Sequence, residues 1–228
     1  MSKQLLMVMT SHNLLGDTGK KTGLWLDEFA APYYAFVDAG YSITLASTMG
    51  GEVPVDPNSL ESDAQTEATK RFSNDDIVRS ALASTIPLDD VREDEFDAVF
   101  YPGGHGPLWD LSDNSDSVAL IEAMIKANKP VAAVCHAPIV LKNARAPDGT
   151  ALVKDKDVTG FSNKEEAGME LTDIVPYLVE DELTSKGGRY SSAEPFEPHV
   201  CESGLLITGQ NPASSKPAAE ALIARLNG

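Results

Sequence analysis

Apolar runs and amphipathic stretches alternate along the chain, with Gly or Pro at many of the junctions. Short apolar runs bounded by turn residues predict buried strands, and apolar positions three and four residues apart predict helices. The predicted strands are 4–10, 41–47, 97–101, 130–135, 157–160 and 205–208. The predicted helices are 27–39, 117–128, one from about 138, most of 164–186, and 215–226. This alternation predicts an α/β fold, a flavodoxin-like three-layer sandwich with a mainly parallel central sheet and helices on both faces.

The stretch 52–95 fits this alternation less well, because it is polar and contains Pro54 and Pro57. Helices are expected within it near 61–72 and 75–84. We interpret the stretch as an insertion that covers one sheet edge or the ligand pocket. No linker or composition shift marks a boundary, so residues 1–228 are expected to form one domain.

Charge and cysteine content narrow the class of protein. Eighteen basic and 35 acidic residues give 18 − 35 = −17, and a surface this acidic repels nucleic acid. No apolar run is long enough to cross a membrane, and 5–9 is too short for a signal peptide core. Cys135 and Cys201 make no disulfide framework, which indicates a reducing compartment. We expect a cytoplasmic protein without nucleic-acid or membrane partners.

In an open parallel sheet, ligands bind beyond the carboxyl ends of the strands. That edge gathers Ser11-His12, Gly103-Gly104-His105, Cys135-His136 and the segment 161–166. Three of the four histidines and one of the two cysteines lie in these segments. The sequence therefore predicts a site at this edge.

The segment 131–138 runs from small apolar residues into Cys135, then His136, then a predicted helix. This order is typical of a nucleophile elbow, where a tight turn exposes a side chain above the sheet. A thiol at a helix N-terminus is expected to have a lowered pKa. The alternative is that Cys135 is a small buried core residue.

Gly103 and Gly104 also follow a strand. Glycines allow backbone N–H groups to approach a ligand, as an oxyanion hole requires. The alternative is an ordinary turn between a strand and a helix.

Three segments taken together resemble the ThiJ/PfpI superfamily, a branch of the class I glutamine amidotransferase-like fold. They are Pro102-Gly103-Gly104-His105-Gly106, Ala133-Val134-Cys135-His136-Ala137-Pro138 and Gly209-Gln210-Asn211-Pro212-Ala213-Ser214-Ser215. Within the superfamily, the sequence is similar to the branch of glyoxalase III enzymes and heat-inducible chaperones. The resemblance covers nearly the whole chain.

The resemblance implies roles for particular residues. Cys135 matches the nucleophile and His136 its neighbouring histidine. The third triad member, an acid shortly after Thr159-Gly160-Phe161-Ser162, matches Glu166, with Glu165 the neighbouring alternative.

A further family glutamate, close to the thiol, matches Glu28, with Asp27 the less favoured neighbour. Burial and a like charge beside Glu28 would raise its pKa. The oxyanion donors match the backbone at Gly104 and His136, and His105 is expected to bind substrate.

Other reactive or aromatic residues receive weaker assignments. His12 is a secondary candidate for the pocket, and His199 is assigned no role. Cys201, Trp25 and Trp109 are interpreted as packing residues.

The resemblance implies a glutathione-independent glyoxalase of the glyoxalase III type, a D-lactate dehydratase lyase. It would convert methylglyoxal, a small dicarbonyl, to lactate through a hemithioacetal on Cys135. No cofactor and no metal are expected, and a homodimer is expected from the resemblance. One alternative is an amidase, peptidase or protein deglycase on the same site. Another, from a different class, is a holding chaperone or an oxidation-sensing stress protein.

Overall fold

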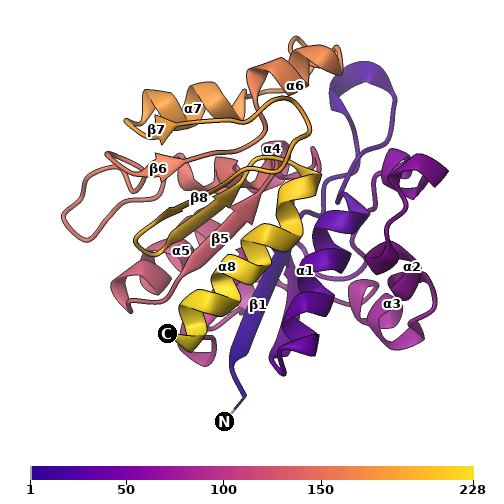
Figure 1. The fold of residues 1–228 in the computed structure, drawn as a ribbon, viewed down its shortest axis with the longest axis horizontal. Helices are drawn as coiled ribbons and strands as arrows, with labels where there is room; N and C mark the ends of the chain where they lie inside the picture. The colour runs from indigo at the N-terminus through magenta and orange to yellow at the C-terminus, as the bar shows by residue number, and fades with distance from the viewer. Residues whose placement is uncertain (1) are drawn as a thin grey trace.

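The centre of the molecule is a seven-stranded sheet with the order β3-β2-β1-β4-β5-β9-β8, seen in a computed structural model that describes residues 2–228 (Figure 1). All neighbouring strands are parallel except β8, which runs antiparallel to β9 at one edge. The strands are β1 (Gln4–Met9), β2 (Ser42–Ser47), β3 (Ile86–Pro87), β4 (Ala98–Tyr101), β5 (Val131–Val134), β8 (Val200–Ser203) and β9 (Leu206–Gly209). The predicted α/β class with a mainly parallel sheet is confirmed.

Helices cover both faces of the sheet because its inner strands are apolar on both sides. Leu5 and Met7 of β1 belong to the core that includes α1 (Leu26–Asp38) and α8 (Ser215–Asn227), which pack side by side. Leu6, the residue between them, faces the opposite core with α5 (Ser115–Lys126). Figure 1 shows α8 and α1 in front of the sheet and α5 behind it.

Several predicted elements differ from the structure. The stretch 164–186 holds two short helices, α6 (Asn163–Gly168) and α7 (Val179–Ser185), with turns between them. The helix expected after Cys135 is a single 3-10 segment, Ala137–Leu141. The expected strand at 157–160 shrinks to β6 (Asp157–Val158), which pairs with β7 (Arg189–Tyr190) in a separate two-stranded sheet.

The stretch 52–95 packs beside α1. It contains α2 (Glu67–Ser73), α3 (Asp76–Leu82) and the edge strand β3. Arg71 of α2 forms a two-pronged ion pair with Asp38 at the end of α1. That this stretch is an insertion, and that the whole chain is one domain, stay predictions.

The remaining helical elements are short. One is α4 (Pro107–Asp110), which follows β4. The 3-10 segments other than the one after Cys135 are Gly16–Thr18, Pro57–Leu60, Ser62–Ala64, Leu88–Asp90, Glu93–Glu95 and Pro212–Ser214.

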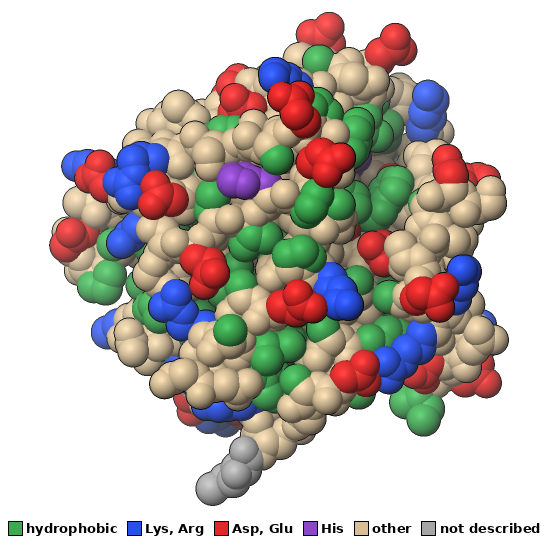
Figure 2. All heavy atoms as spheres, in the orientation of Figure 1, with side chains coloured by type: hydrophobic (Ala, Val, Ile, Leu, Met, Phe, Trp, Pro, Cys, Tyr) green, Lys and Arg blue, Asp and Glu red, His purple; other side chains and the backbone are tan. Residues whose placement is uncertain are grey.

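Acidic side chains are dispersed over the face shown in Figure 2, with basic side chains among them. Within residues 2–228, no helix has the length and apolar character that crossing a bilayer requires.

Candidate active site

The sharp turn predicted at Cys135 is present at the end of β5. Cys135 has a φ of 61°, in the left-handed region that residues with a side chain rarely adopt. Its N–H donates to Gly209 O (2.9 Å) and its carbonyl accepts from Phe161 N (2.7 Å). Because neighbouring elements hold both backbone groups, this strained conformation is fixed, and strain of this kind gathers at functional sites.

Gly103 and Gly104 let the loop after β4 approach the thiol. A Cβ on Gly103 would lie 2.6 Å from Val134 O, 2.8 Å from Glu28 Oε2 and 3.0 Å from Cys135 Cβ. Gly104 has a φ of 89°, and a Cβ there would lie 2.2 Å from Gly23 O. The backbone N–H of Gly104 is near enough to Cys135 to lower the pKa of the thiol, which is the position that an oxyanion donor needs.

Glu28 projects from the first turn of α1 and is fully buried. Its Oε2 accepts from Gly103 N (2.9 Å), while Oε1 has no hydrogen-bond partner in the part of the chain that the structure describes. The carboxyl interacts with Cys135, and burial raises the pKa of Glu28 to about 8. Glu28 therefore carries a proton at neutral pH and is placed to share it with the sulfur. Asp27 instead accepts from Thr66.

The pKa of Cys135 moves opposite to our expectation. Burial, and then the nearby Glu28, raise the pKa of the thiol above its ordinary value. The side chain is only 3% exposed, and the following helix is a five-residue 3-10 segment with little dipole to favour a thiolate. The prediction of a lowered pKa was therefore wrong for this structure.

Cys135, His136 and Glu166 form a continuous hydrogen-bonded chain. His136 Nδ1 lies 3.3 Å from Cys135 Sγ, and His136 Nε2 lies 2.7 Å from Glu166 Oε2. Burial and the neighbouring His105 lower the pKa of His136 to about 4. Burial raises the pKa of Glu166, but the interaction with His136 and His105 outweighs burial and holds that pKa well below its usual range. A charged Glu166 accepts from Nε2–H, so the neutral His136 turns its Nδ1 lone pair toward the thiol.

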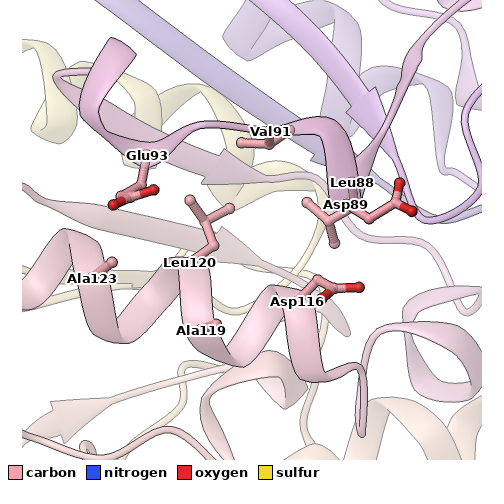
Figure 3. A pocket seen from close by; sticks show the side chains of 8 residues that line it. All are labelled: Leu88, Asp89, Val91, Glu93, Asp116, Ala119, Leu120 and Ala123. Atoms are coloured by element: carbon pink, nitrogen blue, oxygen red, sulfur yellow. The ribbon is translucent and has the colours of Figure 1, made fainter.

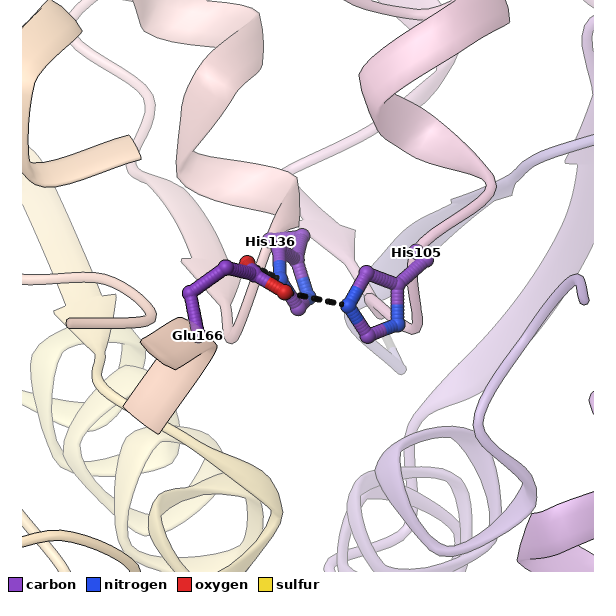
Figure 4. A group of neighbouring side chains, drawn as sticks. All are labelled: His105, His136 and Glu166. Atoms are coloured by element: carbon purple, nitrogen blue, oxygen red, sulfur yellow. Dashed lines mark hydrogen bonds and ion pairs between the residues drawn. The ribbon is translucent and has the colours of Figure 1, made fainter. Parts of the chain in front are cut away.

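His105, in the loop between β4 and α4, contacts the same carboxylate from the other side (Figure 4). Its Nε2 lies 2.8 Å from Glu166 Oε1, and its ring centroid is 3.9 Å from that of His136. One ligand atom from each of His105, His136 and Glu166 lies within 4.8 Å of the others. Two imidazoles and a carboxylate are a donor set that a divalent metal can use, but the same atoms already form the two short hydrogen bonds. Sequence spacing did not reveal this set.

Glu165 has a separate structural role that the sequence analysis missed. It is fully buried, and Oε1 accepts from Phe196 N (2.8 Å) and Asn211 Nδ2 (2.8 Å). Its Oε2 accepts from Ser162 N, Ser162 Oγ and Gln210 Nε2 at 2.7–3.0 Å. Gln210 and Asn211, which follow β9, therefore hydrogen-bond to Glu165, while Glu166 faces the histidines. The signal for this role in the sequence was the adjacent pair Gln210 and Asn211, because buried amide side chains need hydrogen-bond partners.

The thiol opens into a small cavity of about 180 Å³. Carbon atoms dominate its walls, apart from the groups already described. It is lined by Trp25, Glu28, Gly104, His105, Cys135, His136, Phe161, Met169, Phe196 and Pro212. Trp25, predicted to be a packing residue, thus borders the cavity. The cavity suits a small uncharged ligand.

The other residues singled out in the sequence lie elsewhere. His12 does not line the cavity and stacks on Trp109, with ring centroids 5.0 Å apart. Cys201 of β8 lies 3.5 Å from His199 Nε2 and 3.4 Å from Ser191 Oγ, away from the elbow. A second depression, between α5 and the segment 88–93, carries carboxylates but no nucleophile (Figure 3).

Comparison with known proteins gives consistent results. The glutathione-independent glyoxalase hsp3101 of Schizosaccharomyces pombe is 31% identical, with 97% of this chain and 94% of the relative covered. The crystal structure of glyoxalase III from Candida albicans has a TM-score of 0.90 at 30% identity, covering 97% and 96%. The Rapid Encystment Protein 24 KDa of Francisella tularensis has a TM-score of 0.94 at 38% identity, covering 98% and 99%. The sequence pattern of the DJ-1/PfpI family matches residues 26–225. The chain belongs to the DJ-1/PfpI family, as its three sequence motifs predicted, and these relatives include members of its glyoxalase III branch.

Proposed function

We propose that this protein is a glutathione-independent glyoxalase that converts methylglyoxal to lactate. One observation carries the proposal: the Cys135 thiol meets the carboxyl of Glu28, the N–H of Gly104 and Nδ1 of His136 at the floor of a small apolar cavity. The glyoxalases among its relatives support the same activity.

The reaction begins when the sulfur of Cys135 adds to the aldehyde carbon of methylglyoxal. The thiol proton passes to His136 Nδ1 and the new alkoxide takes a proton, giving a hemithioacetal. The N–H of Gly104 is placed to stabilise the developing oxyanion.

Isomerisation moves one proton from C1 to C2 through an enediol. Glu28 and His136 are the acid–base groups nearest the sulfur and would carry that proton. The product is a thioester of lactate on Cys135. Water then cleaves it and regenerates the thiol. Each step uses only groups of this chain, and none needs glutathione.

The test is lactate formation from methylglyoxal in glutathione-free buffer. Cys135→Ala should abolish it, whereas Cys201→Ala should leave it within about twofold of the unmodified enzyme, because Cys201 is a small buried residue of the edge strand β8 that does not line the cavity. Substantial lactate formation by Cys135→Ala would refute the assignment. The small cavity disfavours a peptidase or a protein deglycase, whose substrates are larger.

The homodimer and the cytoplasmic location are part of the same proposal. They are supported by the family resemblance and by the two free cysteines. Light scattering coupled to size exclusion would test the dimer: a mass of one chain across the working concentration range would contradict it.

A further inference from the structure

The carboxylate of Glu166 is hydrogen-bonded to two imidazoles, those of His105 and His136. The fourth ring nitrogen, His105 Nδ1, has no role in the triad. His105 Nε2 and His136 Nε2 lie 2.8 and 2.7 Å from the two oxygens of Glu166. A charged carboxylate only accepts hydrogen bonds, so both Nε2 atoms carry hydrogen. A neutral imidazole that donates through Nε2 presents an unprotonated Nδ1. Each ring therefore has one basic nitrogen, at Nδ1.

The basic nitrogen of His136 is committed to the sulfur, from which it lies 3.3 Å. Its ring lies between His105, with centroids 3.9 Å apart, and Phe161, with centroids 4.3 Å apart. The residue is 1% exposed. His136 also lines the cavity, but its Nδ1 faces the sulfur, so that nitrogen is not free to take a proton from water.

The basic nitrogen of His105 has a different environment. His105 lines the cavity together with Cys135. Between residues 2 and 228, no group forms a hydrogen bond with its Nδ1, although Glu166 fixes the ring through Nε2. A base whose far nitrogen is oriented by a carboxylate, beside a nucleophile, is the arrangement that general-base catalysis uses.

We propose that His105 is a catalytic residue, the general base that activates water to hydrolyse the acyl-thioester on Cys135. This step rests on the proposed function. His105 Nδ1 takes one proton from water, and the oxygen attacks the thioester carbonyl carbon. The tetrahedral intermediate collapses as the carbon–sulfur bond breaks, releasing the carboxylic acid and the thiolate. The proton held by His105 returns to the sulfur, so atoms and charge balance.

Two variants separate catalysis from positioning. In His105→Gln the side-chain amide can still donate to Glu166 but offers no base. His105→Asn provides a second, smaller amide in case the first substitution disturbs folding. His199→Gln, a histidine away from the cavity, is the matched control. Each protein is given methylglyoxal without glutathione, and lactate and the intact mass of the enzyme are followed.

The expected result is a fall in lactate turnover of about 10²- to 10⁴-fold in His105→Gln, as for loss of a general base. One equivalent of methylglyoxal should still be consumed, and the enzyme should accumulate an adduct that hydroxylamine cleaves, which marks a thioester. Turnover within about threefold of the unmodified enzyme would show that His105 only positions Glu166 and would overturn the inference. Loss of turnover without an accumulated thioester would also overturn it, because His105 would then act earlier.

A second substrate keeps this test independent of the glyoxalase proposal. p-Nitrophenyl acetate transfers its acetyl group to a reactive thiol and gives an acetyl-thioester on Cys135 whatever the natural substrate. Hydrolysis of that thioester should be slowed in His105→Gln to a similar degree. If the unmodified enzyme forms no lactate from methylglyoxal but deacetylates rapidly only with His105 present, the proposed function fails and the role of His105 stands. Equal deacetylation rates in the two proteins would overturn the role of His105.

Discussion

Replacing each of two adjacent glutamates by glutamine should have opposite consequences. Glu165 and Glu166 are both buried in α6 and differ by one residue. Four of the five hydrogen-bond donors around Glu165 are N–H groups that cannot accept, whereas Glu166 contacts only imidazoles. We expect Glu165→Gln to cost stability and Glu166→Gln to cost activity. The sequence named Glu165 only as the neighbouring alternative to Glu166 in the triad.

The magnitude for Glu165→Gln follows from its partners. An amide NH₂ at the Oε1 position would face Phe196 N and Asn211 Nδ2, two donors that cannot become acceptors without other losses. The reverse orientation would also lose two bonds, because Ser162 N and Gln210 Nε2 only donate, whereas the Ser162 hydroxyl can rotate to accept. Hydrogen bonds to a charged group contribute roughly 1.5–3 kcal/mol each, so two lost bonds lower the free energy of unfolding by about 3–6 kcal/mol. For a chain of this length that corresponds to a fall in Tm of roughly 10 °C or more.

Glu166→Gln can keep its hydrogen bonds because imidazole can change tautomer. Its amide oxygen still accepts from one histidine, and its NH₂ donates to the other once that ring moves its hydrogen to Nδ1. The expected cost in stability is about 1 kcal/mol. Whichever ring changes, a basic Nδ1 is lost at His136 or at His105, so lactate formation should fall by about 10²-fold or more.

Urea denaturation followed by circular dichroism, together with the lactate assay, measures both effects. Glu165→Asp is the control: it keeps the carboxylate on a shorter side chain, and so separates the effect of side-chain length from the effect of losing the charge. The reasoning is refuted if Glu165→Gln unfolds within about 1 kcal/mol of the unmodified protein, or if Glu166→Gln is equally destabilised.

Three further predictions follow from the same geometry. The pKa of Glu28 is raised from 4.5 to about 8, so the unfolded chain ionises first and stability falls as pH rises between these values. Glu28→Gln should remove that fall, and its stability relative to the unmodified protein should rise by up to about 4 kcal/mol between pH 5 and pH 8 in urea titrations; parallel pH profiles would contradict this. The raised pKa of Cys135 predicts slow alkylation by iodoacetamide at pH 7 and a steep increase above pH 8, measured by peptide mass spectrometry; a rate independent of pH over this range would disprove it. Excess Zn²⁺ should inhibit lactate formation reversibly by binding His105, His136 and Glu166, with EDTA restoring activity, and inhibition of equal potency in His105→Gln would exclude this site.

Local sequence determined much of this protein. Apolar runs in β1, β4 and β5 predicted a buried parallel sheet, because only residues apolar on both sides suit a sheet covered on both faces. The order strand, Cys135, His136 predicted the turn that holds the thiol. Both signals are local: they depend on side-chain polarity and turn chemistry within a few residues.

Tertiary structure decided the properties that depend on distant neighbours. The strand β8 was missed because its pairing with β9 at the sheet edge, more than its own pattern, defines it. The direction of the Cys135 pKa shift depended on burial and on Glu28, which is more than a hundred residues away in the chain. The loops that fold onto α6 determine the different roles of Glu165 and Glu166. They also bring His105 and His136 to the same carboxylate. Sequence spacing carries no information on such contacts, because hydrogen bonding and desolvation act through space and not along the chain.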